Sequence, residues 1–345
     1  MYAFINSIRN YLFDKGIFKA SEFDLPIINV GNLAVGGSGK TPHIEYIIDL
    51  LVPEFNIATL SRGYGRKTKG FREVLSNSSV AESGDEPLQI KQKYSKIKVF
   101  VGEDRVEAIT KILFDYPDID VILLDDAYQH RAIKAGFNIL LSDYSKIFTK
   151  DKSMPFGRLR EYPTAANRSD LVVITKCPED VSRAKKEGLR KEIHKFTNSE
   201  VLFSSINYSE LIPYGNITLN KQIENVLVIS ALATPRAMID YINIKYKPTK
   251  LEHLEFRDHY IFNKNDISAF IKKFNSFAKQ NKIIIISEKD AIRLRAVTKG
   301  TAFDNLGVFI LPIKISFIAE LDKVFNKKII NYVRENKSDY NIHQN

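Results

Sequence analysis

The stretch Val30–Pro42, VGNLAVGGSGKTP, decides the fold. It follows an apolar run, Leu25–Val30, that is typical of a buried strand, and residues 41–51 beyond it have the pattern of a helix. A glycine-rich turn between a strand and a helix, ending in Gly-Lys-Thr, is typical of a P-loop. Ala34 stands where that motif usually has its first glycine. The sequence therefore predicts a phosphate-binding loop within an α/β unit.

Each residue type in this loop has a chemical reason to be there. Glycines adopt positive φ and let main-chain N–H groups approach phosphate oxygens. The helix start adds a partial positive charge, the lysine adds a full one, and the threonine hydroxyl is a ligand for Mg²⁺. An incidental glycine turn is the alternative. The residues predicted to hold the nucleotide are Val35, Gly36, Gly37, Ser38, Gly39, Lys40, Thr41 and Pro42.

Strands and helices alternate along the rest of the chain. Further strands are predicted at Phe55–Leu60, Lys98–Val101, Asp120–Leu124, Phe137–Leu141, Leu171–Thr175, Val226–Ser230, Lys282–Ser287 and Gly307–Pro312. This alternation predicts a mostly parallel sheet with helices on both faces. Ligands of such sheets gather at the carboxyl ends of the strands, where the charged motifs of this chain fall.

The chain divides into five predicted parts. A length of 345 residues fits roughly two domains. We expect an amphipathic helix at 1–20, a P-loop domain at 21–210, a linker at 211–225, a smaller α/β domain at 226–335 and a frayed tail at 336–345.

Composition narrows the class of protein. With 51 Lys and Arg against 41 Asp and Glu, the net charge of +10 favours an anionic partner such as a nucleic acid, a phosphorylated ligand or an acidic lipid surface. The single cysteine, Cys177, excludes an internal disulfide framework and a cysteine-clustered metal site. No apolar run approaches the roughly 20 residues that a membrane-spanning helix needs.

The first 20 residues predict an amphipathic, mildly basic helix. Phe4, Ile8, Tyr11 and Leu12 recur at helical spacing, with arginine and lysine nearby. Two roles fit this pattern: a helix packed on its own domain, or a helix that lies on a membrane surface.

Two aspartates follow the predicted strand at 120–124. Asp125 and Asp126 stand where P-loop proteins hold the Mg²⁺ shell, so we predict that they bind the metal together with Thr41. Helix capping by Asp126 is the alternative. Gln129 and His130 follow at once in the run DDAYQHR, and so polar a cluster at a strand end predicts a site.

Two further loops in this half carry charged residues. SRGYGR, at 61–66, ends a strand, and its Arg62 and Arg66 are suited to clamping phosphates. SGDEP, at 83–87, offers a carboxylate, Asp85, that can take a proton from an acceptor hydroxyl. A solvated turn is the alternative for each loop.

Two clusters lie far downstream. One is FRDHY at 256–260, for whose His259 a packed or surface histidine is the alternative. The other is SEKDAIR at 287–293, for which a capped, ion-paired helix start is the alternative.

Taken together and in this order, the motifs resemble those of the tetraacyldisaccharide 4′-kinase family, the lipid A 4′-kinases of Gram-negative bacteria. The shared runs are VGNLAVGGSGKTP, LSRGYGR, GDEP, DDAYQHR, FRDH and SEKDAIR, from about Arg9 to Arg293. The resemblance implies two α/β/α domains, with the P-loop in the N-terminal one, joined by a short β-ribbon hinge.

The resemblance also implies a reaction and a location. The enzyme would transfer the γ-phosphate of ATP, with Mg²⁺, to the 4′-hydroxyl of a tetraacylated glucosamine disaccharide 1-phosphate, giving lipid IVA in lipid A (lipopolysaccharide) biosynthesis. It would act as a peripheral protein at the cytoplasmic face of the inner membrane. Neither a nucleic acid nor an obligate protein partner is implied.

The roles of the family's motif residues fall on particular positions of this chain. The aspartate of GDEP, the proposed base, falls on Asp85; the histidine of F-x-D-H, which assists it, on His259; and the arginine of LSRGY on Arg62. With Lys40 these are the predicted catalytic residues. The predicted substrate contacts are Tyr64, Arg105, Gln129, His130 and Arg160.

Two other classes of protein stay open on the sequence alone. A GTPase-like or metallochaperone P-loop NTPase would need a base-reading N-K-x-D motif, which Thr175-Lys176-Cys177-Pro178 resembles only without its aspartate. A non-enzymatic nucleic-acid binder is suggested by the net charge alone, and it would show steep salt dependence and no ATP turnover.

Overall fold

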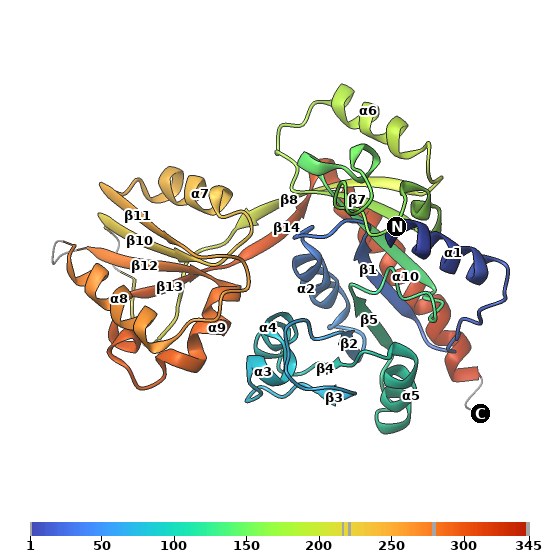
Figure 1. Ribbon diagram of the computed structural model, residues 1–345, viewed down its shortest axis with the longest axis horizontal. Helices are drawn as coiled ribbons and strands as arrows, with labels where there is room; N and C mark the ends of the chain where they lie inside the picture. The colour runs from blue at the N-terminus through green and yellow to red at the C-terminus, as the bar shows by residue number, and fades with distance from the viewer. Residues whose placement is uncertain (1, 216, 220–221, 278–280, 343–345) are drawn as a thin grey trace. The chain divides into compact units, whose positions relative to one another are not determined.

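The computed structural model describes residues 2–215, 217–219, 222–277 and 281–342, and it consists of two units (Figure 1). Unit 1 comprises Met1–Ile206 and Ile315–Asn345, and unit 2 comprises Asn207–Lys314. The chain passes between the units twice, within strands β8 (Glu200–Tyr208) and β14 (Ile313–Phe317). These two strands are neighbours in one sheet, as a β-ribbon connection requires.

Unit 1 is built on a nine-stranded sheet in the order β14-β8-β7-β6-β1-β5-β2-β4-β3. Its other strands are β1 (Ile27–Asn32), β2 (Ile57–Ser61), β3 (Arg72–Glu73), β4 (Lys98–Val101), β5 (Val121–Asp125), β6 (Phe137–Asp143) and β7 (Leu171–Thr175). The pairings from β8 to β4 are parallel, and β3 is antiparallel to β4. β1 lies where the chain order reverses, and the loop after such a strand is a usual ligand site.

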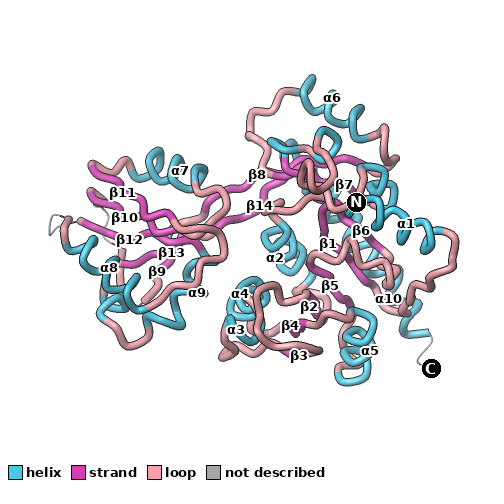
Figure 2. Tube along the Cα trace, in the orientation of Figure 1, coloured by secondary structure: helices cyan, strands magenta, loops and turns pink. Residues whose placement is uncertain are grey.

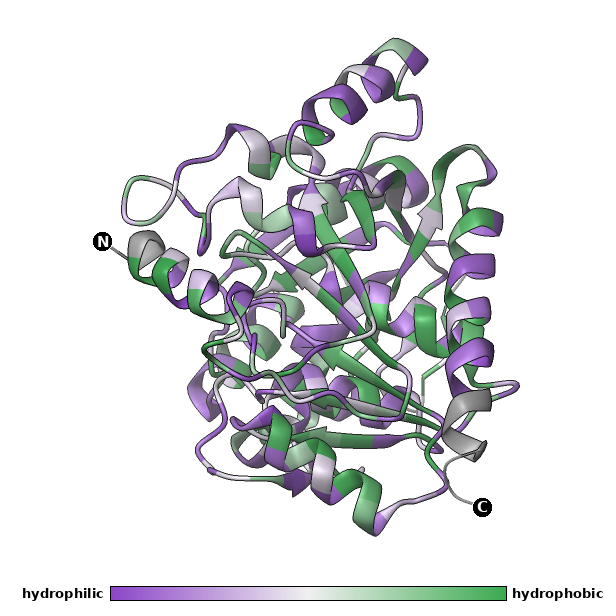
Figure 3. Ribbon diagram, turned by 90° about the vertical axis from the view of Figure 1, so that its right-hand side faces the viewer, coloured by the Kyte–Doolittle hydropathy of each residue, from purple (hydrophilic) through white to green (hydrophobic). Residues whose placement is uncertain are grey.

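Helices cover this sheet on both faces. Ile122 and Leu124 of β5 pack in one apolar cluster with Ile109 of α5 (Arg105–Asp115). Leu123, which is equally buried, therefore faces the opposite side of the sheet, where α2 (Lys40–Leu51) contacts β1 and β5. Figure 2 shows the alternation of helix and strand, and Figure 3 shows the largely apolar strands between helices of mixed polarity. The predicted mostly parallel α/β fold is confirmed. The helices of unit 1 are α1 (Tyr2–Asp14), α2 (Lys40–Leu51), α3 (Val80–Ser83), α4 (Asp85–Lys93), α5 (Arg105–Asp115), α6 (Arg183–Ile193) and α10 (Leu321–Ile342).

The C-terminal helix α10 packs on unit 1. Its residues Phe325, Ile329 and Val333 are fully buried, and the Tyr332 hydroxyl donates to the Ile27 carbonyl oxygen of β1 at 3.2 Å. The apolar face of α10 therefore completes the core of the first unit.

The boundaries of the two units differ from the predicted domain boundaries. The C-terminal domain was expected to run to residue 335, whereas residues from Ile315 onward return to unit 1 because α10 packs there. The tail expected from residue 336 continues as helix to Ile342, and 343–345 lie outside the described residues. The expected linker at 211–225 falls within unit 2, where strand β9 (Ile212–Pro213) pairs with β13 (Val308–Leu311).

Unit 2 contains a five-stranded sheet in the order β11-β10-β12-β13-β9, parallel except for β9. Its remaining strands are β10 (Asn225–Ser230), β11 (Lys250–Glu255), β12 (Lys282–Ser287) and β13 (Val308–Leu311). Its helices are α7 (Arg236–Tyr246), α8 (Lys264–Asn275) and α9 (Glu288–Thr298).

Candidate active site

The loop between β1 and α2 is open to solvent. Val35 is 42% exposed, and a Cβ added at Gly36 or Gly37 would meet no heavy atom within 4 Å. Gly36 and Gly39 have φ angles of 112° and 83°, which favour glycine. Ser38 is buried, and its hydroxyl has no hydrogen-bond partner among the described residues. Open main chain and an orphaned hydroxyl suit a ligand that is rich in oxygen acceptors.

Four side chains meet beside this loop. Lys40 Nζ lies 3.6 Å from Asp126 Oδ2, and Arg160 pairs with the same carboxylate at 2.7 Å. The side-chain oxygen of Asn32 accepts hydrogen bonds from both cations. Burial pushes the pKa of Asp126 up, but attraction to Lys40 and Arg160 outweighs it and holds the pKa below its usual value. Asp126 therefore stays ionised at neutral pH.

Main-chain hydrogen bonds bring two of these residues to the end of β1. Asp126 N donates to the Val30 carbonyl at 3.0 Å, which fixes the end of β5 against β1. Arg160 N donates to the Leu33 carbonyl at 2.7 Å, so the loop that follows β6 runs beside the start of the P-loop. The structure thus brings the predicted substrate contact Arg160 to the nucleotide loop.

Asn32 is a site residue that the sequence analysis missed. It ends β1 and is 2% exposed, and its carbonyl accepts hydrogen bonds from Gln129 Nε2 and Arg160, both at 3.0 Å. The one signal in the sequence is an amide side chain at the last position of a buried strand, directly before the glycine-rich loop. It holds two predicted substrate contacts against the start of the phosphate loop.

The predicted metal ligands supply oxygen donors at the same edge of the sheet. Asp125 ends β5 and is 3% exposed, Asp126 follows it, and Thr41 is buried in the first turn of α2. Carboxylate and hydroxyl oxygens are the donors that Mg²⁺ prefers, so the residues present fit this metal. Helix capping by Asp126 does not occur, because the described chain between Asp126 and β6 contains no helix.

Asp85 is the first residue of α4 and is 5% exposed. The turn before it packs main chain to main chain against the loop after β2. A Cβ at Gly84 would lie 2.8 Å from the Tyr64 carbonyl oxygen, and one at Gly63 would lie 2.8 Å from that of Ser83. Only glycine at both positions lets the two loops approach this closely, and the approach places Asp85 beside the SRGYGR loop.

Helices α2 and α4 pack side by side. Gln89 Nε2 donates to Glu45 Oε1 at 2.8 Å, and Lys93 pairs with Glu45 at 2.6 Å. Each helix leads from the carboxyl edge of the sheet to the start of a parallel strand, so both helices begin at that edge. Asp85 and Thr41 lie one turn before Gln89 and Glu45. The general-base candidate is thus brought to the edge that carries the P-loop.

Arg62, Arg105 and His130 form a basic group at this edge. Burial, and then repulsion by Arg62, lowers the pKa of Arg105 to about 10; burial, and then repulsion by Arg105, lowers the pKa of His130. Arg105 is 3% exposed and donates to the carbonyls of Gly102 and Glu103, so it forms the buried part of this group. His130 Nε2 is buried without a hydrogen-bond partner among the described residues. An anion would relieve this repulsion.

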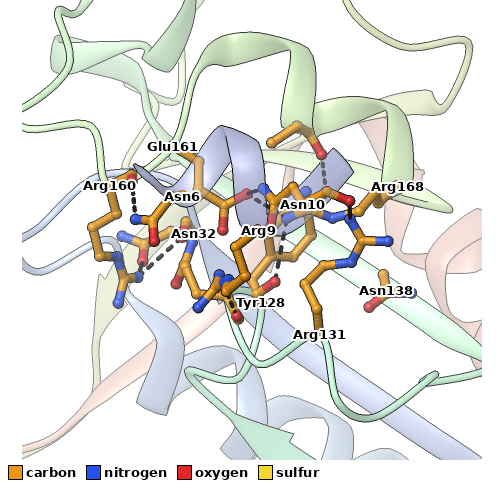
Figure 4. A network of polar contacts seen from close by, with 12 residues as sticks. Asn6, Arg9, Asn10, Asn32, Tyr128, Arg131, Asn138, Arg160, Glu161 and Arg168 are labelled. Carbon is orange, nitrogen blue, oxygen red and sulfur yellow. Dashed lines mark hydrogen bonds and ion pairs between the residues drawn. The ribbon is translucent and has the colours of Figure 1, made fainter. Parts of the chain in front are cut away.

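Helix α1 contacts the site loops through its polar side, as Figure 4 shows. Asn6 Nδ2 donates to the Arg160 carbonyl and Arg9 donates to the Gln129 carbonyl, each at 2.9 Å. The buried Asn6 side chain therefore fixes α1 against the loop that carries Arg160.

The apolar side of α1 faces solvent. Ile5, Ile8 and Tyr11 are 58%, 48% and 57% exposed, while the side chain of Phe4 lies outside the described part. A helix that serves only its own domain buries its apolar face. This helix instead leaves Ile5, Ile8 and Tyr11 exposed, as an apolar strip beside the site loops.

In unit 2, His259 is held by the SEKDAIR cluster. Arg293 donates to His259 Nδ1 at 3.2 Å, and because arginine only donates, a neutral ring carries its proton on Nε2. Arg293 also donates to the Ala231 carbonyl at 2.9 Å and lies 3.4 Å from Asp290. Ser287 caps α9 by accepting from Asp290 N, so the capped helix start is present and orients the histidine as well.

Comparison with known proteins identifies the same family as the motifs do. The family model of tetraacyldisaccharide-1-P 4′-kinase matches residues 1–330. The chain belongs to this family. Tetraacyldisaccharide 4′-kinases of Bacteroides fragilis and Phocaeicola vulgatus are 40% and 38% identical to it, over 96% and 97% of this chain and 90% and 93% of theirs.

A solved structure of the same family is also similar. It is a crystal structure of LpxK from Aquifex aeolicus in complex with ATP, with a TM-score of 0.71 and 26% identity over 96% of each chain. The predicted tetraacyldisaccharide 4′-kinase family, its fold and its enzyme class are confirmed. A GTPase-like NTPase and a nucleic-acid binder, the two alternatives from the sequence, do not describe this family.

Proposed function

We propose that this chain transfers the γ-phosphate of ATP to the 4′-hydroxyl of an acylated glucosamine disaccharide 1-phosphate. The observation that carries the proposal is the group of Lys40, Asp126, Arg160 and Asn32 beside an open glycine loop. The group provides two cations at the start of a helix, which is where a nucleotide's phosphates are best stabilised. Membership of the family supplies the identity of the acceptor.

The phosphates of ATP would bind along the main chain of the P-loop. Lys40 would exchange part of its attraction to Asp126 for the β- and γ-phosphate oxygens, and the buried Ser38 hydroxyl would gain a hydrogen-bond partner, which it lacks within the described part of the chain. Arg160 stays within reach of the same phosphates, because Asn32 ties it to the loop. We therefore assign Arg160 to the charge of the transferred group rather than to the acceptor.

Mg²⁺ is part of the proposal as the partner of the nucleotide. Thr41, Asp125 and Asp126 would hold it, directly or through water, and when bound it would neutralise charge on the β- and γ-phosphate oxygens.

Asp85 is the proposed general base. As the acceptor oxygen bonds to the γ-phosphorus and the bond to the β-phosphate oxygen breaks, the hydroxyl proton passes to the Asp85 carboxylate and ADP leaves. The Glu86 N–H donates to Asp85 Oδ1 at 2.9 Å and orients the carboxylate. The assistance of His259 in this step, drawn from the family motif, stays a prediction.

The acceptor carries a second anion, its 1-phosphate. The basic group of Arg62, Arg105 and His130 is the proposed place for it, because an anion there relieves the repulsion between the two arginines and favours the protonated form of His130. Arg62 and Tyr64 are exposed and can reach a bound acceptor, whereas Arg105 stays behind them. Arg62 also remains a candidate for stabilising the charge of the transferred group.

Helix α1 is proposed to bring the enzyme to a lipid surface, at the cytoplasmic face of the inner membrane. Its polar side is used against the protein, and its apolar side is exposed. An interfacial helix inserts such a strip among the lipid chains. Among the residues that the structure describes, no helix has the length and apolarity needed to cross a membrane.

The double substitution Ile5→Ser/Ile8→Ser tests this role of α1. We expect binding to vesicles that contain anionic phospholipid to weaken about 10- to 100-fold, because binding no longer transfers two exposed apolar side chains from water into the lipid. The KM for the lipid acceptor should rise while the KM for ATP stays unchanged. Vesicle sedimentation and steady-state kinetics measure the two effects.

The matched control is Ile244→Ser, on α7 of unit 2, where the side chain is 74% exposed. This variant should bind vesicles as the wild type does. If the α1 variant also sedimented like the wild type, the proposed role of α1 would be wrong.

The transfer itself is tested with ATP and the disaccharide 1-phosphate. We expect one phosphate to be added per ADP formed, and ³¹P NMR should place it on the 4′ oxygen. An acceptor without the 4′-hydroxyl should give no product. ATP hydrolysis without a phosphorylated lipid would contradict the proposed function.

A further inference from the structure

Three side chains outside the P-loop motif hold consecutive carbonyl groups of the loop. Lys176 Nζ donates to the carbonyl oxygen of residue 37, Thr175 Oγ1 donates to that of residue 38 at 2.9 Å, and His43 Nδ1 bonds to that of residue 39 at 2.7 Å. The first two residues follow each other at the end of β7, and the third lies in α2. We call these three side chains the loop braces.

Each loop brace is itself anchored. Lys176 pairs with Asp143, at the end of β6, at 2.9 Å, and Thr175 is fully buried. His43 is bonded through Nε2 to Ser204 Oγ of β8 at 3.1 Å, and burial lowers the pKa of His43 to about 4. The ring is therefore neutral at neutral pH, with Nδ1–H donating to the loop and Nε2 accepting from the serine. Three neighbouring strands thus contribute to one loop.

The braces fix the direction of the loop's amides. In a trans peptide the C=O of one residue and the N–H of the next point in opposite directions. The carbonyls of residues 37 and 38, held toward the end of β7, therefore turn the N–H groups of Ser38 and Gly39 the other way, and the carbonyl of residue 39, held toward α2 by His43, turns the N–H of Lys40 away from that helix. Ser38 N is used within the loop, where it donates to the Gly36 carbonyl at 3.1 Å. The N–H of Gly39 is therefore directed away from the end of β7 and that of Lys40 away from the body of α2, as a phosphate site at a helix start requires.

The backbone of one loop brace is strained. Lys176 has a φ of 57°, in the left-handed region that costs a side-chain-bearing residue about 1 kcal/mol or more. Such a conformation persists when the surrounding contacts determine it, and it is common at functional sites. Its ion pair with Asp143 and its bond to the P-loop are the contacts that hold it here.

We propose that Thr175, Lys176 and His43 are positioning residues that hold the phosphate loop in its nucleotide-binding form, so that the affinity for a triphosphate depends on them. The inference rests on the proposed function, nucleotide binding at this loop. In the run TKCP, the first two residues act on the phosphates rather than on the base of the nucleotide.

Two variants test the inference by calorimetric titration with two probes, ATP and inorganic tripolyphosphate. Lys176→Met and Thr175→Val each remove one brace. We expect each variant to bind ATP and tripolyphosphate more weakly by the same factor, about three- to tenfold, because each variant loses one hydrogen bond that orders the loop. The KM for ATP should rise while kcat and the KM for the lipid acceptor stay unchanged.

Matched controls separate bracing from folding and from charge. Thr175→Ser keeps the hydroxyl and should retain wild-type affinity. Lys186→Met removes from α6 a positive charge that lies close enough to Cys177 to offset part of the rise that burial causes in the pKa of that thiol. This variant should leave the affinities for ATP and for tripolyphosphate unchanged. If Thr175→Val did not fold, the test would rest on Lys176→Met, because the Lys176 side chain is 28% exposed and its replacement leaves the core intact.

The outcomes are distinct. A wild type that binds neither probe would overturn the proposed function, and the braces with it. A wild type that binds both, with variants that bind equally well, would overturn the bracing alone. Variants that lose ATP affinity but keep tripolyphosphate affinity would show that these residues act on the nucleoside, which would also overturn it.

Discussion

Asp85→Asn will lower kcat by about 10²- to 10⁴-fold while ATP affinity stays at the wild-type value, because a positioned general base contributes a factor of that size. The amide has nearly the same shape as the carboxylate, so the start of α4 keeps its packing against the SRGYGR loop. It cannot accept the proton of the acceptor hydroxyl. Steady-state kinetics with the disaccharide acceptor and calorimetry with ATP measure the two quantities.

The neighbouring carboxylate provides the control for this prediction. Glu86→Gln removes a negative charge from the same helix turn and should leave kcat unchanged. A wild-type kcat in Asp85→Asn would refute the role of general base. A large loss of ATP affinity in the same variant would instead assign Asp85 to the nucleotide.

Lys40→Met has the second large expected effect. We expect ATP affinity to fall about 10- to 100-fold, because a hydrogen bond between charged groups is lost. Asp126 would keep Arg160 as its partner but would face the phosphates with one cation fewer. At saturating ATP, kcat should fall by about 10²- to 10³-fold, as for other losses of a group that stabilises developing charge. ATP titration and initial rates measure both effects.

The control is Lys67→Met, which removes an exposed ammonium from the loop after β2. This variant should bind ATP as the wild type does. The comparison distinguishes the direct contact of Lys40 with the phosphates from the general effect of removing one charge from a chain with a net charge of +10. The assignment of Lys40 would be wrong if Lys40→Met bound ATP as tightly as the wild type.

Local patterns predicted the elements that carry the motifs. The strands Lys98–Val101, Leu171–Thr175 and Lys282–Ser287 have the predicted bounds, because each is a short apolar run between turn residues. β8 and β14 were not predicted. β14 pairs with β8, which lies about 100 residues earlier in the chain, and β8 pairs with β7 as well; no local pattern encodes such partners.

The same limit applies to the site. The glycine loop and the Asp125-Asp126 pair were found because each motif is contiguous in the sequence. Asn32, Thr175 and Lys176 were not assigned to the site, because their roles depend on which strands are neighbours of β1 and β6. Strand order follows from long-range packing, so it appears only in the folded chain.

Helix α1 illustrates a different limit. Its periodicity predicted two unlike faces but not which face is buried. The structure turns the polar face inward, because Asn6 and Arg9 find hydrogen-bond acceptors on the site loops. The choice between packing on the domain and lying on a membrane was therefore not exclusive: the polar face of the helix does the first, and its apolar face is available for the second.

A single-turnover experiment follows the transferred phosphoryl group itself from ATP to the lipid. Wild type and Asp85→Asn are loaded with ATP labelled in the γ-phosphate, the disaccharide 1-phosphate is added, and the label is followed in the lipid and in inorganic phosphate. We expect the label to move to the 4′ oxygen in the wild type and to stay on bound ATP in Asp85→Asn. Equal transfer by both proteins, or label released only as inorganic phosphate by the wild type, would contradict this expectation.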